Sequence, residues 1–245
     1  MIEKDVIVTT KYGNMPSFTA CPDGGGPFPG VIMYMDAPGM REEIRNLARR
    51  VAKMGYFCLL PDLYYRLGRL RFDIPRRNDA MSVVIRGAMN SLTNEQVFDD
   101  TAGLIAYLDA QDRVKGGPIG CIGYCMSGCY VATVAARFPH RIAAAAALYG
   151  IGLVTDQPDS PHLLIDRIKG ELYLGFAEHD PAVPANVVPE LQAAFAKHGT
   201  KHEMETFAGA HHGFQSPERP TYNSAASEAA WAKTFAMWER TLKQG

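Results

Sequence analysis

The 245-residue chain has no apolar run of about eighteen residues, which is close to the length that a helix needs to cross a membrane. Its first residues, Met1–Asp5, do not combine a charged segment with an apolar one, as a secretory signal peptide does. The sequence therefore indicates a cytoplasmic protein that does not insert into a membrane.

Neither sign of charge is in clear excess, because 25 Lys and Arg face 26 Asp and Glu and the formal net charge is −1. Such a balance supplies no general attraction for nucleic acid or for an acidic membrane surface. The sequence also lacks internal repeats, low-complexity tracts and a linker that would divide it. We expect residues 1–245 to form a single α/β domain, as a monomer or a homodimer, since such folds commonly reach this size undivided.

The sequence has five cysteines, which do not indicate a disulfide framework. An odd number, with three close together at Cys121, Cys125 and Cys129, favours reduced thiols in the cytoplasm. These three do not share one helix face, because Cys121 precedes a turn, and no histidine pair with ligand spacing accompanies them. We expect neither a metal nor a cofactor.

What the sequence does contain is an alternation of strand-like and helix-like segments. Strands are expected at 5–10, 16–21, 30–35, 56–60, 118–123, 141–149, 171–176 and 202–207, and helices at 41–54, 94–111, 129–136, 187–197 and 225–242. The first two strands resemble an antiparallel pair. The alternation of the other strands with helices predicts a mostly parallel sheet that is covered by helices on both faces. The ligand-binding loops of such a sheet lie at the carboxyl ends of its strands.

The segment Gly123–Gly128 (GYCMSG) places Cys125 where an apolar strand turns sharply into a helix. In such a nucleophile elbow the central residue has a strained backbone, and its neighbours must be small. The free N–H groups and the positive dipole end of the following helix favour a thiolate and a developing oxyanion. Cys125 is therefore the expected nucleophile. Two alternatives are an inert buried cysteine and an elbow centred on Ser127, although the latter puts cysteines where glycines are wanted.

An elbow nucleophile needs an acid and a base, which follow it along the chain in that order, each on a loop after a later strand. Asp180 follows one expected strand and is the expected acid, with Glu178 as the alternative. His212 follows the next strand and precedes the glycine and phenylalanine typical of a catalytic histidine loop; the alternative base is His211. These residues and Cys125 all fall at carboxyl ends of strands, so they are expected to line one cleft.

The segment 64–92 is long for a plain connection and is expected to form a lid or a substrate-binding insertion. It carries six arginines among apolar residues: Arg66, Arg69, Arg71, Arg76, Arg77 and Arg86. Arginine binds carboxylates bidentately, so we expect at least one of them to contact an anionic substrate, while any single one is more simply a solvated surface charge. Tyr64 and Tyr65, just beyond a strand end, are expected either to line the pocket or to pack as aromatic rings under this segment.

Four motifs together make the sequence similar to the dienelactone hydrolase family (carboxymethylenebutenolidases) of α/β-hydrolases, from about Val31 to Trp238. They are GYCMSG at 123–128, GFAEHD at 175–180, GAHHGF at 209–214 and LPDLY at 60–64. The resemblance implies an α/β-hydrolase fold with Cys125 as nucleophile, Asp180 as acid and His212 as base. It also implies that the backbone N–H groups of Ala37 and Met126 form the oxyanion hole.

Two positions depart from the family pattern. Asp36 stands where the family has a glutamate that helps to draw the proton from the thiol, and it is one methylene shorter. The family enzyme that opens dienelactones has an arginine shortly after the catalytic histidine, whereas here Arg219 is the nearest cation beyond His212. These departures leave the identity of the substrate open.

The resemblance implies a hydrolase that opens a lactone or cleaves another small carboxylic ester through an acyl-enzyme on Cys125. One alternative is a cysteine amidase or amidotransferase, which typically uses a His-x-Glu pair that this chain lacks. The other is a redox-sensing or binding protein on the same fold, which would need neither Asp180 nor His212.

Overall fold

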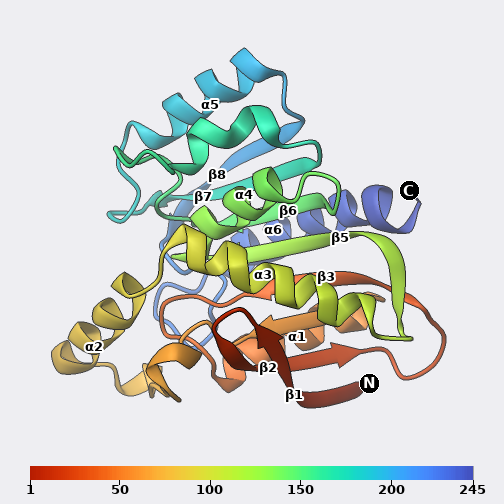
Figure 1. Cartoon of the computed structure of the whole chain (residues 1–245). Coiled ribbons are helices and arrows are strands. Elements are labelled where there is room, and N and C mark those ends of the chain that lie inside the picture. Colours follow the sequence, from red (N-terminus) through yellow and green to blue (C-terminus); the bar gives the residue numbers. More distant parts are fainter. Residues whose placement is uncertain (245) are drawn as a thin grey trace. The chain divides into compact units, whose positions relative to one another are not determined.

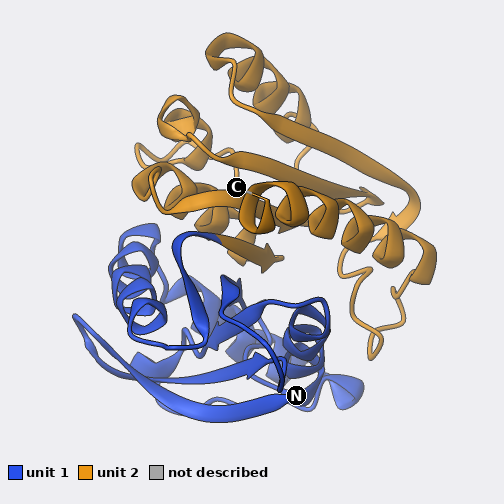
Figure 2. Cartoon of the chain, turned by 90° about the vertical axis from the view of Figure 1, so that its right-hand side faces the viewer, with its two compact units in different colours: residues 1–119 blue, residues 120–245 orange. Residues whose placement is uncertain are grey.

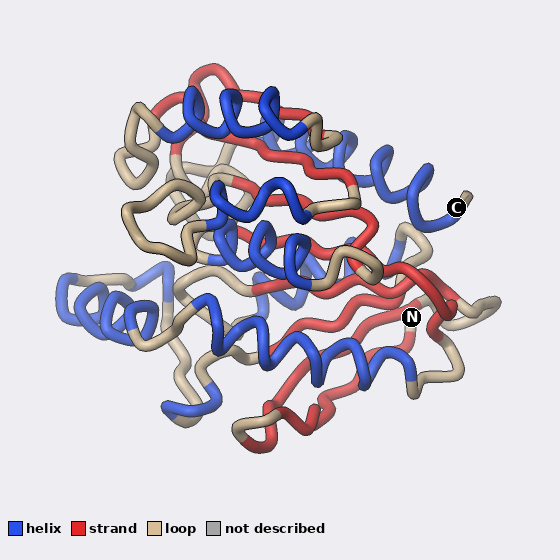
Figure 3. Tube along the Cα trace, turned by 45° about the horizontal axis from the view of Figure 1, so that its top comes forward, coloured by secondary structure: helices blue, strands red, loops and turns tan. Residues whose placement is uncertain are grey.

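The structure, a computed structural model, describes residues 1–244. The chain forms two compact units, residues 1–119 and residues 120–245, which Figure 2 colours separately. In both units, strands alternate with helices along the chain, as the tube in Figure 3 shows. The α/β class predicted from the sequence is confirmed, whereas the single domain over 1–245 stays a prediction.

The strands of the first unit are β1 (Ile2–Thr10), β2 (Gly13–Cys21), β3 (Phe28–Tyr34) and β4 (Phe57–Pro61), hydrogen-bonded in the order β1-β2-β4-β3. β1 and β2 form the antiparallel pair that the sequence predicts, with Ile2 opposite Cys21 at one end. β2 also runs antiparallel to β4, and β3 runs parallel to β4. β3 and β4 are almost wholly buried, as expected for strands covered on both faces.

Two helices cover the strands of the first unit. α1 (Glu42–Lys53) packs on β2 and β4, α3 (Asn94–Asp109) packs on β1 and β4, and Figure 1 shows α3 in front of these strands and α1 behind them. After α1 the chain turns at Gly55, whose φ of 89° suits glycine and whose N–H donates to Ala52 O at 2.9 Å. α3 begins with a capping box, in which Thr93 and Gln96 each accept from the other's backbone N–H.

The segment 64–92 is not a plain loop. It contains two short 3-10 turns, η1 (Tyr65–Leu67) and η2 (Ile74–Arg76), followed by α2 (Asp79–Asn90). α2 begins at Asn78, whose side chain accepts from the backbone N–H of Met81 at 2.8 Å. It buries only Ile85 and Ala88, so most of its surface is available for contact.

In the second unit the order of strands is β5-β6-β7-β8, where β5 (Val114–Tyr124) crosses the unit boundary. β6 (Ile142–Leu148), β7 (Glu171–His179) and β8 (His202–His211) pair in parallel. The carboxyl ends of these parallel strands therefore lie at one edge. β7 and β8 each run further than the sequence predicts, to His179 and His211, so that the loops carrying the expected acid and base are correspondingly shorter.

Helices also cover the strands of the second unit. α4 (Ser127–Arg137) packs on β6, and α6 (Ser224–Trp238) packs on β6 and β7; Figure 1 shows α4 in front and α6 behind. The helix predicted over 225–242 is divided, because α6 ends at Trp238 and a π-helical turn, η4 (Glu239–Lys243), continues it. η3 (Pro161–Arg167) and α5 (Val187–His198) complete the unit. Over residues 1–244, no helix is long and apolar enough to cross a membrane.

Candidate active site

Cys125 occupies the turn between β5 and α4 with a φ of 54°, a conformation that is strained for a residue other than glycine. Its N–H donates to Leu148 O at 3.2 Å, and its own carbonyl accepts from the N–H groups of Gly128 at 3.1 Å and Ile151 at 2.9 Å. These bonds tie the turn to the end of β6 and to the first turn of α4. The backbone strain is therefore held in place by its surroundings.

The glycines on either side of the turn are required by close approach. A Cβ at Gly123 would lie 2.7 Å from Ser127 O, and a Cβ at Gly128 would lie 2.3 Å from Gly150 Cα. A side chain at either position would push the backbone of Ser127 or of Gly150 away from the turn. Ser127 is fully buried, whereas Cys125 as a whole residue is 8% exposed. Of the two candidate nucleophiles, only Cys125 is exposed to solvent at all.

A chain of hydrogen bonds joins three side chains of the second unit. Asp180 Oδ2 lies 2.8 Å from His212 Nδ1, and His212 is also hydrogen-bonded to Cys125. The Asp180 side chain is 3% exposed, and its Oδ1 accepts the N–H of Ala182 at 3.0 Å. With both oxygens engaged, the carboxylate can hold the imidazole in one orientation and one tautomer.

The electrostatic surroundings of His212 favour its protonated form. Burial alone lowers the pKa of His212, but the hydrogen bond that His212 donates to Asp180 and the contact with Cys125 outweigh burial and raise the pKa to about 9. At neutral pH the imidazole is therefore an imidazolium, which can donate a proton to a leaving group.

The alternative acid and base have other partners. Glu178 accepts the N–H of Gly209 at 2.7 Å and lies 3.6 Å from His179 Nε2. The ring of His211 lies 4.9 Å from that of His179, and both histidines are exposed. The structure thus brings Asp180 and His212 together with Cys125, and it places Glu178 and His211 in a separate, solvent-facing group.

Tyr149, which sequence reasoning did not single out, contacts the imidazole of His212. It follows β6 with a φ of 40°, and its N–H donates to Gly175 O at 2.7 Å. Its ring lies edge-on to the His212 ring at 5.2 Å and to the Phe214 ring at 5.1 Å. Its place at the carboxyl end of a parallel strand was the only available signal, because positive φ at tyrosine has no sequence signature.

In the first unit, Asp36 is bound by an arginine. Nη1 and Nη2 of Arg41 donate to its two carboxylate oxygens at 2.6 and 3.0 Å, and Asp36 is 1% exposed. Arg41 also donates to Glu43 and to Gly39 O. Burial alone would lower the pKa of Arg41, but the charges and hydrogen bonds of Asp36 and Glu43 outweigh burial and raise the pKa above its ordinary value. The position expected to assist the thiol is thus half of a buried ion pair.

The two expected oxyanion residues lie in different units. Ala37 is 7% exposed, and its carbonyl accepts the hydroxyl of Tyr64 at 2.7 Å. Tyr64 is 1% exposed and braces the loop after β3 in this way. Met126 is the residue that precedes α4, and its carbonyl accepts Cys129 Sγ at 3.0 Å. Burial, together with the charge of Cys125, raises the pKa of Cys129 to about 12, so that Cys129 stays a neutral thiol at neutral pH.

The arginines of segment 64–92 differ in their partners. Arg66 donates to buried Asp100 at 2.8 Å and stacks on two tyrosine rings, so its role is structural. Arg71 donates to Asp62 and Arg77 to Ser82, while Arg76 pairs with Asp73 and is 87% exposed. Among residues 1–244, Arg69 and Arg86 have neither a hydrogen bond nor an ion pair.

Arg219, the nearest cation after His212 in sequence, also lies close to its loop. A Cβ at Gly213 would lie 2.8 Å from Arg219 Nη1, so the guanidinium packs directly on the residue after His212. Gly213 has a φ of 83°, which suits glycine. In the part of the chain that the structure describes, no group of three or more His, Cys, Asp or Glu side chains is arranged to hold a metal ion.

The sequence has named relatives over almost its whole length. A protein of Synechocystis named "Putative carboxymethylenebutenolidase" is 28% identical over 98% of this chain and 98% of its own length. A Methylorubrum extorquens protein of the same name is 26% identical over 98% of this chain and 81% of its own length.

The fold has a counterpart in a crystal structure from Klebsiella pneumoniae, titled as a putative dienelactone hydrolase. It is 23% identical, covers 98% of both chains and has a TM-score of 0.87. The profile of the dienelactone hydrolase family matches residues 15–242 of this chain, which is nearly all of it. The chain therefore belongs to the dienelactone hydrolase family and has its α/β-hydrolase fold.

Proposed function

We propose that the chain is a cysteine-dependent hydrolase of a lactone or another small carboxylic ester, with Cys125, His212 and Asp180 as its triad. Membership of the family supports the hydrolase class. The observation that carries the mechanism is the hydrogen-bonded chain from Asp180 through His212 to Cys125, at a backbone turn with a φ of 54°.

In this mechanism the Cys125 thiolate attacks the carbonyl carbon, and the C=O electron pair moves onto oxygen. The N–H groups of Met126 and Ala37 stabilise the oxyanion. The oxyanion collapses, the C–O bond to the alcohol breaks, and the His212 imidazolium gives its proton to the departing alkoxide. A thioester on Cys125 remains. For a lactone, the released hydroxyl stays attached to the acyl group.

Deacylation reverses the roles of these groups. His212, now neutral, takes a proton from water as the oxygen attacks the thioester, and the second oxyanion expels the Cys125 thiolate beside the regenerated imidazolium. Asp180 keeps its charge throughout and stabilises the imidazolium. The product is a carboxylic acid, which loses its proton to solvent.

The five cysteines bear on the compartment. All five are free thiols in the structure. A thiol nucleophile needs a reducing environment to remain active, and we therefore place the enzyme in the cytoplasm.

A rapid-mixing assay with p-nitrophenyl acetate tests the proposal. We expect a burst of p-nitrophenol equal to the enzyme concentration and a mass increase of one acetyl group on the peptide that contains Cys125. Cys125→Ala should abolish the burst and lower turnover by about four powers of ten or more. The matched control, Cys129→Ala, removes a neighbouring thiol and should retain the burst.

Two outcomes would contradict the proposal. A folded wild-type protein that shows neither a burst nor steady hydrolysis with aryl esters, lactones or anionic esters is not an ester hydrolase, and a sensor or binding role then gains support. If Cys125→Ala keeps near wild-type turnover while Ser127→Ala loses it, the nucleophile has been assigned to the wrong residue of the elbow.

A further inference from the structure

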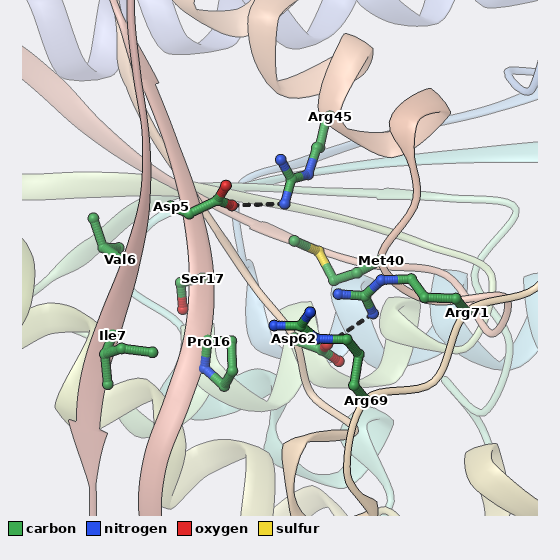
Figure 4. Close-up of a pocket in the computed structure, with 10 residues that line it drawn as sticks. All are labelled: Asp5, Val6, Ile7, Pro16, Ser17, Met40, Arg45, Asp62, Arg69 and Arg71. Carbon is green, nitrogen blue, oxygen red and sulfur yellow. Dashed lines mark hydrogen bonds and ion pairs between the residues drawn. The ribbon is translucent and has the colours of Figure 1, made fainter.

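The first unit contains a pocket of about 430 Å³ that the proposed reaction does not use (Figure 4). Its walls come from β1, β2, the start of α1 and the chain that follows β4. This volume is in the usual range for small-molecule sites, which are concave and mostly apolar with a few polar groups that orient the ligand.

The charged side chains of the pocket do not balance. Asp5 binds Arg45 at 2.6 Å, and Asp62 binds Arg71 at 3.2 Å, which Figure 4 marks as dashed lines. The third guanidinium, that of Arg69, has no hydrogen bond and no ion pair among residues 1–244, and it acts on Asp62 only at longer range. Three arginines therefore face two aspartates, and the pocket keeps one uncompensated positive charge.

The orientation of Arg69 also favours a ligand. In Figure 4 the side chains of Arg69 and Arg71 enter the pocket from the same segment and converge near Asp62, with the guanidinium of Arg69 directed inward. A guanidinium presents two parallel N–H groups that match the two oxygens of a carboxylate. An anion beside Arg69 would give that residue its missing partner.

Apart from Ser17, the remaining wall is apolar. Met40, Pro16 and Ile7 line the pocket, and Ile7 leaves 57% of its surface exposed. A ligand with an apolar body would cover this surface and gain from the loss of contact with water. Inorganic phosphate carries the required charge but has no group for the apolar wall.

We propose that this pocket binds a small carboxylic acid with an apolar body, whose carboxylate is held by Arg69 and flanked by Arg71. The proposal does not depend on the reaction at Cys125, and its test measures binding and not turnover. It assigns an anion-binding role to one arginine of the segment 64–92, whereas the sequence led us to expect a contact with the substrate itself.

Benzoate is a suitable probe, with benzyl alcohol as the neutral molecule of similar shape and inorganic phosphate as the anion without an apolar body. Titration calorimetry on the full chain should give a dissociation constant of about 1 mM or tighter for benzoate, and little heat from the other two. In protein labelled with 13C at the methionine methyl groups, benzoate should shift the Met40 resonance. The buried Met237 of the second unit is the internal reference.

Arg69→Gln should weaken benzoate binding at least about tenfold and abolish the Met40 shift, because it removes the charge-assisted bonds. The matched control is Arg76→Gln in the same segment, an exposed arginine outside the pocket, which should bind as the wild type does. Circular dichroism and thermal melting check that both variants fold. Raising the salt concentration should weaken the wild-type binding.

Three outcomes would overturn the proposal. Equal binding of benzoate by Arg69→Gln and wild type places the acid elsewhere, and equal binding of benzyl alcohol shows that the carboxylate is not recognised. Phosphate that binds as tightly as benzoate, with the same loss in Arg69→Gln, identifies a plain anion site and rejects the apolar wall. Absence of any benzoate binding at 10 mM, a concentration about tenfold above the expected constant, rejects the site altogether.

Discussion

The ring of Tyr149 lies edge-on to the imidazole of His212, with the ring centres 5.2 Å apart. Tyr149 reaches this position through a positive φ of 40°, fixed by a 2.7 Å bond from its N–H to Gly175 O. Together with Asp180, it limits the freedom of the imidazole from two sides. The carboxylate sets the tautomer, and the aromatic ring sets the plane.

Replacing Tyr149 tests this positioning role. An edge-to-face pair of this kind contributes about 0.5–1.5 kcal/mol, so Tyr149→Leu should lower kcat by about threefold to tenfold while KM changes little. Tyr149→Phe keeps the ring and should stay close to wild type. Equal losses in both variants would assign the effect to the hydroxyl. A loss in Tyr149→Leu that appears only in stability, with kcat unchanged, would make the contact merely structural.

The choice between the adjacent histidines gives a second prediction. His212→Ala should abolish ester hydrolysis, while His211→Ala should retain most of it, because His211 packs against His179 and is exposed. Asp180→Asn should also be severely impaired, since an amide can hold the imidazole in the wrong tautomer. Steady-state rates on one aryl ester suffice for the comparison. The reverse pattern for the histidines would move the base to His211.

The pH dependence of stability follows from the raised pKa of His212. A group whose pKa rises on folding, here from an ordinary 6.5 to about 9, stabilises the fold fully below pH 6.5, and the stabilisation is lost as the pH rises through 9. Denaturant melts of wild type and His212→Gln should therefore diverge by on the order of 1–3 kcal/mol at pH 6 and converge by pH 10. A difference that stays constant over this range would contradict the raised pKa.

The ion pair between Asp36 and Arg41 bears on how the thiol is activated. Both oxygens of Asp36 are bound by Arg41. We therefore expect Cys125 to lose its proton mainly to His212, with the N-terminus of α4 stabilising the thiolate. Iodoacetamide should then modify the free enzyme quickly, with a rate that His212→Ala lowers strongly and Asp36→Asn changes little. Slow alkylation that accelerates when a substrate analogue is added would show instead that Asp36 is released from Arg41 and acts on the thiol.

A fifth prediction concerns the charge of the substrate. Arg219 packs on Gly213, the residue after His212, and it is the Lys or Arg nearest to the proposed base in sequence. If it binds a substrate carboxylate, an anionic ester should have a higher kcat/KM than its neutral methyl ester, and the preference should fall with added salt and in Arg219→Gln. Equal values that do not respond to salt would point to a neutral substrate.

The sequence predicted those features that depend on local spacing. The small residues around Cys125 can be recognised in a single sequence. The same is true of the loops that carry the acid and the histidine after later strands. The antiparallel pair of β1 and β2, the capping box at Thr93 and the turn at Gly55 were also predictable, because each depends on residues a few positions apart.

Contacts between distant residues had no such signature. Arg66 and Asp100 are 34 positions apart, and nothing in the sequence around either residue indicates that the two side chains will form a hydrogen bond. Tyr149 reads as the end of an apolar strand, and only the fold shows that it faces His212. The bond between Arg41 and Asp36 could have been anticipated, because the two residues are only five positions apart and a glycine lies between them. The φ of 75° at Gly39 is what lets the chain fold back on itself.

The contact between Gly128 and Gly150 limits how this protein can change. Because a Cβ at position 128 would lie 2.3 Å from Gly150 Cα, saturation mutagenesis of either position should return almost only glycine among folded, active clones. The two positions are 22 residues apart in sequence, yet a side chain at either one would collide with the backbone of the other. α2, by contrast, buries only two of its side chains, so we expect it to tolerate far more variation. We therefore expect folded variants to accept substitutions in residues 64–92 far more often than substitutions at the elbow.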